Sequence, residues 1–220
     1  MARLANRDPG ARAQPAARSQ DFKRYRSIET MMRIVSAITV EFLRGLPAIV
    51  GGEALDETQR LVEQWALAGH VVVRTGNPVR RQDGRWELAQ EIVEAEAQGY
   101  SSLVGGRVLV SQHAEKRSLG RSLQAEPGLD FPADSTFALY LLLTFPDCPI
   151  LPALTNEPAI VAHCQDMQSI PPLRHAFSLG GPAQRVALLD PEGAQRGWIL
   201  ESDKIPYSVV FQRPTRRPSR

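Results

Sequence analysis

The sequence predicts an α+β protein, in which an N-terminal part of helices and strands precedes a mainly antiparallel β C-terminal part. Apolar residues between positions 27 and 68 recur at steps of three and four, which is typical of amphipathic helices. Valine-rich segments bounded by glycine and proline follow from residue 70 onward, which is typical of strands. The chain has 220 residues, 43% of them hydrophobic, and can therefore bury a core without disulfides or metals.

Two helices are expected first. Residues 27–43 would form one, with an apolar face made of Ile28, Met31, Met32, Val35, Ile38, Phe42 and Leu43. The second would occupy residues 55–68, because Asp56 and Gln59 form a variant of the capping box and Gly69 stands where a C-terminal cap belongs.

A pair of strands joined by a basic loop is expected next. Residues 70–74 contain three consecutive valines, which favour extended backbone. Residues 75–84 form a polar loop that ends in the turn pair Asp83-Gly84, and residues 85–89 form the returning strand. A short helix is expected over residues 90–98.

The remaining chain predicts mainly strands and loops. A strand is expected over residues 107–111, followed by a long loop at 112–134. Residues 137–145 are expected to form a buried strand or a short helix, and their length and aromatic residues favour the strand. In the proline-rich stretch that follows, only residues 159–167 could form a helix. Residues 185–190 and 197–201 predict a hairpin around Pro191-Glu192-Gly193, and residues 207–212 predict the third strand of a meander.

The order helix, loop, helix, strand, basic loop, strand in residues 27–89 resembles the recognition-helix-and-wing region of winged-helix regulators. The residues that carry the resemblance are RLVEQWALAGHVVVR, then a basic loop, then RWELA. The resemblance covers about 60 residues, contains no specific motif and is therefore an analogy at the level of the fold. It implies a winged-helix-like module over residues 27–100. The composition and pattern of the rest predict a disordered basic tail at 1–26, an α+β region with a C-terminal antiparallel meander at 101–212 and a basic tail at 213–220.

Arginine-rich loops are the candidate nucleic-acid-binding sites. The wing-like loop and its flanks carry Arg74, Arg80, Arg81 and Arg85 against a single acid, Asp83, so the loop suits contact with a phosphate backbone. The helix before it offers Arg60 but also several carboxylates, which argues against specific reading of bases. A second cluster lies beside or within the 112–134 loop and consists of Arg107, Lys116, Arg117 and Arg121.

The distribution of charge points to the same kind of partner. The net charge is +2, but residues 1–26 carry +5 and residues 213–220 carry +4, so the intervening chain is acidic. We therefore expect a non-enzymatic subunit of a larger assembly that holds DNA or RNA through its phosphates, together with protein partners and no cofactor. The N-terminus lacks the apolar core of a secretory signal and no segment predicts a membrane span, so a cytoplasmic location is expected.

Two alternatives remain open. The winged-helix-like module could dock a protein, since an acidic second helix suits that use. The chain could also be a small cysteine-dependent hydrolase that uses Cys148 with His163. Cys164 beside His163 does not have the ligand spacing of a zinc site, so no metal is expected.

Overall fold

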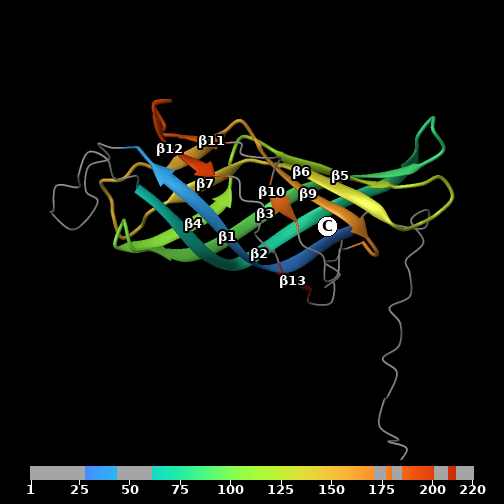
Figure 1. Ribbon diagram of the computed structural model, residues 1–220, viewed down its shortest axis with the longest axis horizontal. Coiled ribbons are helices and arrows are strands. Elements are labelled where there is room, and N and C mark those ends of the chain that lie inside the picture. Colours follow the sequence, from blue (N-terminus) through green and yellow to red (C-terminus); the bar gives the residue numbers. More distant parts are fainter. Residues whose placement is uncertain (1–27, 44–60, 171–176, 180–184, 201–207, 212–220) are drawn as a thin grey trace, which may run out of the picture.

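The computed structural model describes residues 28–43, 61–170, 177–179, 185–200 and 208–211. Every regular secondary-structure element in these residues is a β-strand (Figure 1). The predicted α+β class is therefore wrong, because the described part of the chain is an antiparallel β-structure. The strands are β1 (Ile28–Phe42), β2 (Leu61–Arg80), β3 (Trp86–Ser101), β4 (Gly106–Gln112), β5 (Ser118–Gln124), β6 (Ala133–Leu139), β7 (Leu141–Thr144), β8 (Leu154–Glu157), β9 (Ile160–Met167), β10 (Ser178–Leu179), β11 (Arg185–Leu189), β12 (Gln195–Leu200) and β13 (Ser208–Phe211).

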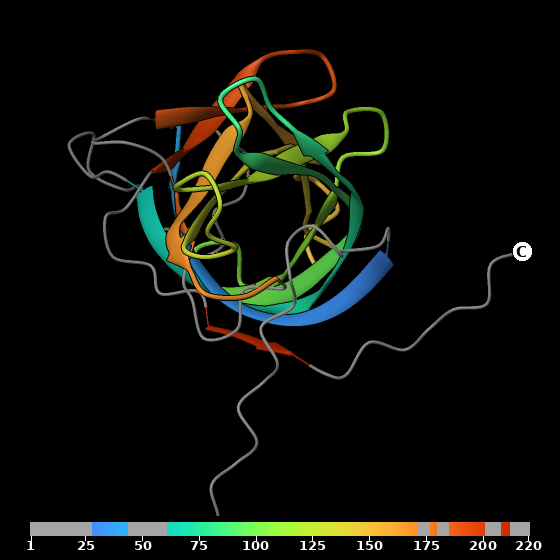
Figure 2. The ribbon, with the colours of Figure 1, turned by 90° about the vertical axis from the view of Figure 1, so that its right-hand side faces the viewer.

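Eight of these strands close into an antiparallel barrel, which is seen from one end in Figure 2. The neighbours around the ring are β3, β2, β1, β12, β11, β8, β7 and β4, and the pairing of β4 with the C-terminal half of β3 closes it. A closed ring leaves no unpaired sheet edge around its circumference.

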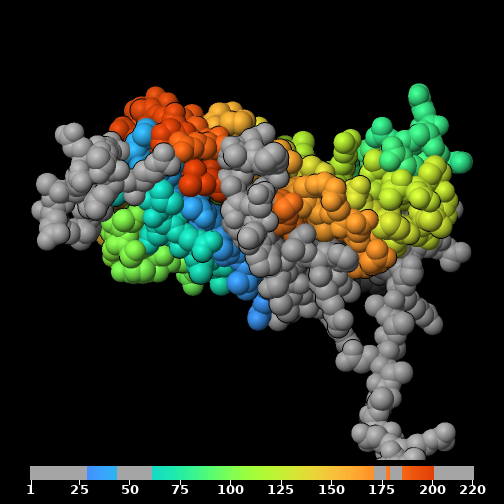
Figure 3. Space-filling view, viewed as in Figure 1, coloured from blue at the N-terminus to red at the C-terminus, as the bar shows by residue number. Residues whose placement is uncertain are grey.

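Three long strands extend the structure beyond the barrel. β1, β2 and β3 contain 15, 20 and 16 residues, and their far halves continue into a second group of strands. There the N-terminal half of β3 pairs with β5, and the sheet proceeds through β6 and β9 to β10. The body is elongated as a result, with the β11–β12 hairpin near one end and the β2–β3 hairpin at the other (Figures 1 and 3).

The first predicted helix is wrong, because residues 28–42 form β1. Its apolar residues match a helical spacing, but alternate positions from Thr30 to Phe42 also face inward with a period of two. Met31 and Val35, which the helical pattern placed on the buried face, are exposed. The segment is rich in isoleucine, valine and threonine, which are stiff at χ1 and pack well on a pleated sheet.

The other predicted helices are also strands where the structure describes them. Residues 61–68 belong to β2, residues 90–98 lie inside β3, and residues 160–167 form β9. The start of the second predicted helix, including Arg60, lies outside the described residues. The winged-helix module is therefore a wrong prediction, because the described part of the expected recognition helix, residues 61–68, is a strand.

Several strand predictions are confirmed. Residues 107–111 lie in β4, and residues 185–200 form the β11–β12 hairpin. The predicted wing strands form the β2–β3 hairpin, although β2 continues to Arg80 and shortens the loop. Gly84 takes a φ of 84° in the turn, as the Asp83-Gly84 pair predicts.

Other strand and loop predictions need correction. The expected loop at 112–134 contains β5, and the single strand expected at 137–145 is divided at Tyr140 into the end of β6 and β7. The last strand, β13, pairs with β1 and not with the hairpin before it, so the predicted C-terminal meander is not formed. The basic tails at 1–26 and 213–220 lie outside the described residues.

The core follows the inner face of the sheet in two groups. The larger group includes Trp65, whose ring lies 5.9 Å from that of Phe42 and 6.1 Å from that of Phe145. The smaller group lies under the second half and includes Leu88 and Met167. The described segments contain no helix with the length and hydropathy that a membrane crossing requires.

Candidate ligand-binding cavity

A cavity of about 180 Å³ lies on the inner face of the long strands. Its wall is built by inward-facing residues of β1, β2, β3, β4, β6, β7 and β9, with Ile170 and Phe177 beyond β9. Side chains alternate between the two faces of a strand, so β1 contributes every second residue from Thr30 to Ile38 to the wall. The cavity is therefore a consequence of the sheet and not of a single loop.

The cavity wall is mainly apolar and elongated. On β1 it extends from Thr30 to Ile38, which corresponds to about 26 Å at roughly 3.3 Å per residue. The apolar lining residues are Met32, Ile34, Ile38, Leu67, Val71, Val73, Ile92, Ala95, Ala97, Val110, Phe137, Leu139, Leu141, Ile160, Ala162, Ile170 and Phe177. An engineered apolar cavity of about 150 Å³ is large enough to bind benzene, so this space can hold a slender organic molecule.

All the uncharged polar residues of this wall except Ser36, which lies further along β1, gather at one part of it. Thr30, Thr75, Gln90 and Ser135 line the cavity and are all buried. The Gln90 side-chain oxygen accepts hydrogen bonds from the hydroxyls of Ser135, at 3.2 Å, and Ser122, at 2.8 Å. We refer to these five residues as the polar belt.

Ionisable groups are nearly absent from the cavity wall. Among its described lining residues the one carboxylate is Glu96, whose side chain is exposed to solvent, and there is no lysine, arginine or histidine. No group of three or more metal-binding side chains occurs in the part of the chain that the structure describes. The wall is thus suited to binding by apolar contact and neutral hydrogen bonds.

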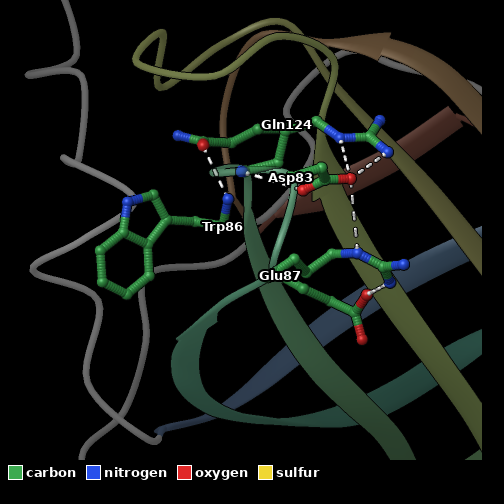
Figure 4. Close-up of polar contacts among 6 residues, drawn as sticks. Asp83, Trp86, Glu87 and Gln124 are labelled. Atoms are coloured by element: carbon green, nitrogen blue, oxygen red, sulfur yellow. Dashed lines mark hydrogen bonds and ion pairs between the residues drawn. The ribbon is translucent and has the colours of Figure 1, made fainter.

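The basic residues predicted at the wing-like hairpin are mostly paired with carboxylates. Arg81 contacts Glu87 at 2.6 Å, and Arg85 contacts Asp83 at 2.7 Å, as drawn in Figure 4. The hydrogen bonds from Arg85 hold the pKa of Asp83 below its ordinary value. In the same view the backbone nitrogen of Trp86 donates to the side-chain oxygen of Gln124, which ties the hairpin to β5.

Arg74 and Arg117 both contact Glu91 from the outer face of the sheet, at 3.4 and 2.7 Å. Two guanidinium nitrogens of Arg74 also donate hydrogen bonds to the carboxylate of Glu29. The hydrogen bond from Arg117 holds the pKa of Glu91 below its ordinary value. These guanidinium groups are therefore already neutralised by neighbouring strands.

The remaining predicted basic residues lie apart from one another. Arg107 binds Asp147, whose pKa its hydrogen bonds lower to about 2, and Lys116 pairs with Glu157. Within the described segments, Arg80 and Arg121 make no ion pair. The predicted basic cluster thus forms no continuous unpaired surface, and nucleic-acid binding stays a prediction that neither the fold nor the ion pairs favour.

The two cysteines are buried in different parts of the core. Cys148 belongs to the larger group and Cys164 to the smaller. Burial raises the pKa of Cys164 to about 11, with further contributions from Asp134 and Asp166. His163 contacts Ser178 through its backbone oxygen on β9.

The cavity was not predicted from the sequence, in part because Thr30 and Gln90 were assigned to helices and Thr75 and Ser122 to loops. Thr30 and Ser36 interrupt the apolar spacing expected of a helix but continue the alternation of a strand. Gln90, Ser122 and Ser135 lie far apart in the sequence, and no local motif relates them. The alternation of inward-facing and outward-facing residues along β1 was the one sequence pattern that could have indicated this wall.

Comparison with known proteins gives a structural likeness only. No protein-family model and no curated protein sequence matches the chain. A solved structure, DynF from the dynemicin biosynthesis pathway of Micromonospora chersina, superposes with a TM-score of 0.68. The alignment covers 97% of this chain and 94% of DynF at 16% sequence identity, which shows that the two chains share a fold.

Proposed function

We propose that this protein binds an elongated apolar small molecule in its cavity and carries it without changing it chemically. The observation that supports the proposal is the long apolar wall inside the sheet, with no buried ionisable group among its described residues. Each methylene that moves from water into such a space contributes about 0.8 kcal/mol. A slender hydrocarbon-like molecule would therefore gain affinity along the whole wall.

The shared fold agrees with a role in small-molecule biosynthesis. DynF comes from the dynemicin biosynthesis pathway. We infer that this chain serves a comparable kind of process as a binding protein for an apolar intermediate or product. A carrier needs a largely apolar cavity that holds no reactive group, and the described wall has these properties.

The proposal can be tested by filling the cavity. Ala162 lines it from β9, whereas its neighbour Val161 faces the outside and is 40% exposed. We expect Ala162→Phe to weaken binding of the neutral dye Nile red by at least about tenfold, or about 1.4 kcal/mol, because the ring would occupy ligand space.

Val161→Phe is the matched control, since it adds a ring on the same strand but on the outer face. It should bind Nile red like the unmodified protein. Circular dichroism and thermal melting would establish that both variants are folded. Equal binding by two folded variants, or no binding by the unmodified protein, would contradict the proposed function.

A further inference from the structure

We infer that the cavity selects a ligand that carries an uncharged hydrogen-bonding group on its apolar skeleton, and that the polar belt binds this group. This inference rests on the proposed function and specifies its ligand. The belt consists of Thr30, Thr75, Gln90, Ser122 and Ser135, as defined above. Four of the five line the cavity. The fifth, Ser122, donates a hydrogen bond to the side-chain oxygen of Gln90.

The topology places these residues side by side although they are far apart in the sequence. They lie on β1, β2, β3, β5 and β6, which are consecutive neighbours in the sheet. Thr75 is directly opposite Gln90 in the β2–β3 pairing, and Ser122 is directly opposite Ser135 in the β5–β6 pairing. The belt therefore crosses five strands on one face of the sheet.

The belt has hydrogen-bonding capacity that the protein does not use. Gln90 is only 7% exposed, and both contacts to its amide come from the serine hydroxyls on one side. Within the described residues, the other end of the Gln90 amide and the hydroxyls of Thr30 and Thr75 make no hydrogen bond. A net hydrogen bond contributes about 0.5–1.5 kcal/mol, so a ligand group that bonds to these atoms gains affinity.

The charge of the site disfavours a carboxylate head group. No basic side chain lines the described wall, and Arg74 and Arg117 are paired with Glu91 on the outer face. Burying an ion without a counter-charge costs more than burying a neutral polar group. Hydroxyl, carbonyl and amide groups can exchange hydrogen bonds with the belt without this cost.

Three ligands of the same chain length would test the selectivity: 1-decanol, decane and decanoate, each measured by displacement of Nile red. We expect 1-decanol to bind up to about tenfold more tightly than decane, which corresponds to one net hydrogen bond. Decanoate should bind more weakly than 1-decanol at pH 8. In Gln90→Met the preference for 1-decanol over decane should fall to about one while decane binding is retained.

Gln98→Met is the control, because Gln98 is on the same strand with its side chain exposed. It should keep the preference for 1-decanol. Equal binding of 1-decanol and decane to the unmodified protein, or tightest binding of decanoate, would overturn the inference and leave the apolar carrier function standing. If none of the three displaces Nile red and Nile red itself does not bind, the proposed function fails and the inference fails with it.

Discussion

The indole Nε1 of Trp65 donates a hydrogen bond of 2.8 Å to Oε2 of Glu63, two residues before it on β2. The same carboxylate accepts hydrogen bonds from the hydroxyl of Ser101 and from the backbone nitrogen and hydroxyl of Ser102. Burial disfavours ionisation of Glu63, but the hydrogen bonds from both serines and Trp65 outweigh it and hold its pKa below the ordinary value. Glu63 therefore joins the aromatic core to the turn between β3 and β4.

Glu63→Gln should destabilise the fold by about 1–3 kcal/mol at pH 7, because an amide cannot accept all of these hydrogen bonds. The folded-state pKa of Glu63 is lowered, so its contribution is present above the unfolded pKa and is lost as the pH falls through the folded pKa. Urea unfolding at pH 7 and at pH 3 would measure this. A difference between the two proteins that does not shrink at the lower pH would contradict the assignment.

Two glycines of β2 should differ in their tolerance of alanine. A Cβ at Gly69 would overlap the carbonyl oxygen of Glu96, whereas a Cβ at Gly76 would lie 3.4 Å from the nearest atom, the carbonyl oxygen of Ala89. Gly69→Ala should therefore cost about 1–3 kcal/mol or more, since backbone must move. Gly76→Ala should change stability by less than about 1 kcal/mol. Similar melting temperatures for the two variants would show that β2 and β3 can separate at Gly69 without cost.

Phe42→Ala should destabilise the protein by about 3–5 kcal/mol, because it opens a cavity among aromatic rings. Phe42 is buried at the barrel end of β1 and contacts both Trp65 and Phe145. Val35→Ala is the control on the outer face of the same strand and should remain within about 0.5 kcal/mol. Chemical unfolding would measure both, and a loss below about 1 kcal/mol for Phe42→Ala would contradict the packing described.

The cysteine thiols should react slowly in the folded protein. Both are buried, and burial raises the pKa of Cys164 to about 11, so little of the Cys164 thiolate is present near neutral pH. A thiol-specific chromogenic reagent at pH 7.5 should label two thiols quickly in urea and neither one quickly without it. Rapid labelling of one folded thiol, assigned with Cys148→Ser and Cys164→Ser, would instead favour the cysteine-dependent hydrolase alternative.

The sequence alone determined the local parts of the β-structure. The β11–β12 hairpin was predictable because its strands are adjacent and joined by a Pro-Glu-Gly turn, so its contacts are local. The β2–β3 hairpin was predictable for the same reason, from consecutive valines and the Asp83-Gly84 turn pair. In both hairpins the turn residues and strand-forming residues that predict the structure lie within a few residues of the strand pairs they predict.

Only the tertiary structure decided between helix and strand for β1, because its apolar residues satisfy both periods. The strand conformation depends on pairing with β2 over fifteen residue pairs and with β12 near the other end of the described chain. More than 100 residues of sequence also separate Thr30 from Ser135 in the polar belt and Met32 from Phe177 in the cavity wall. Backbone hydrogen bonds between distant strands bring these residues together, and no local pattern of residue types encodes such pairing.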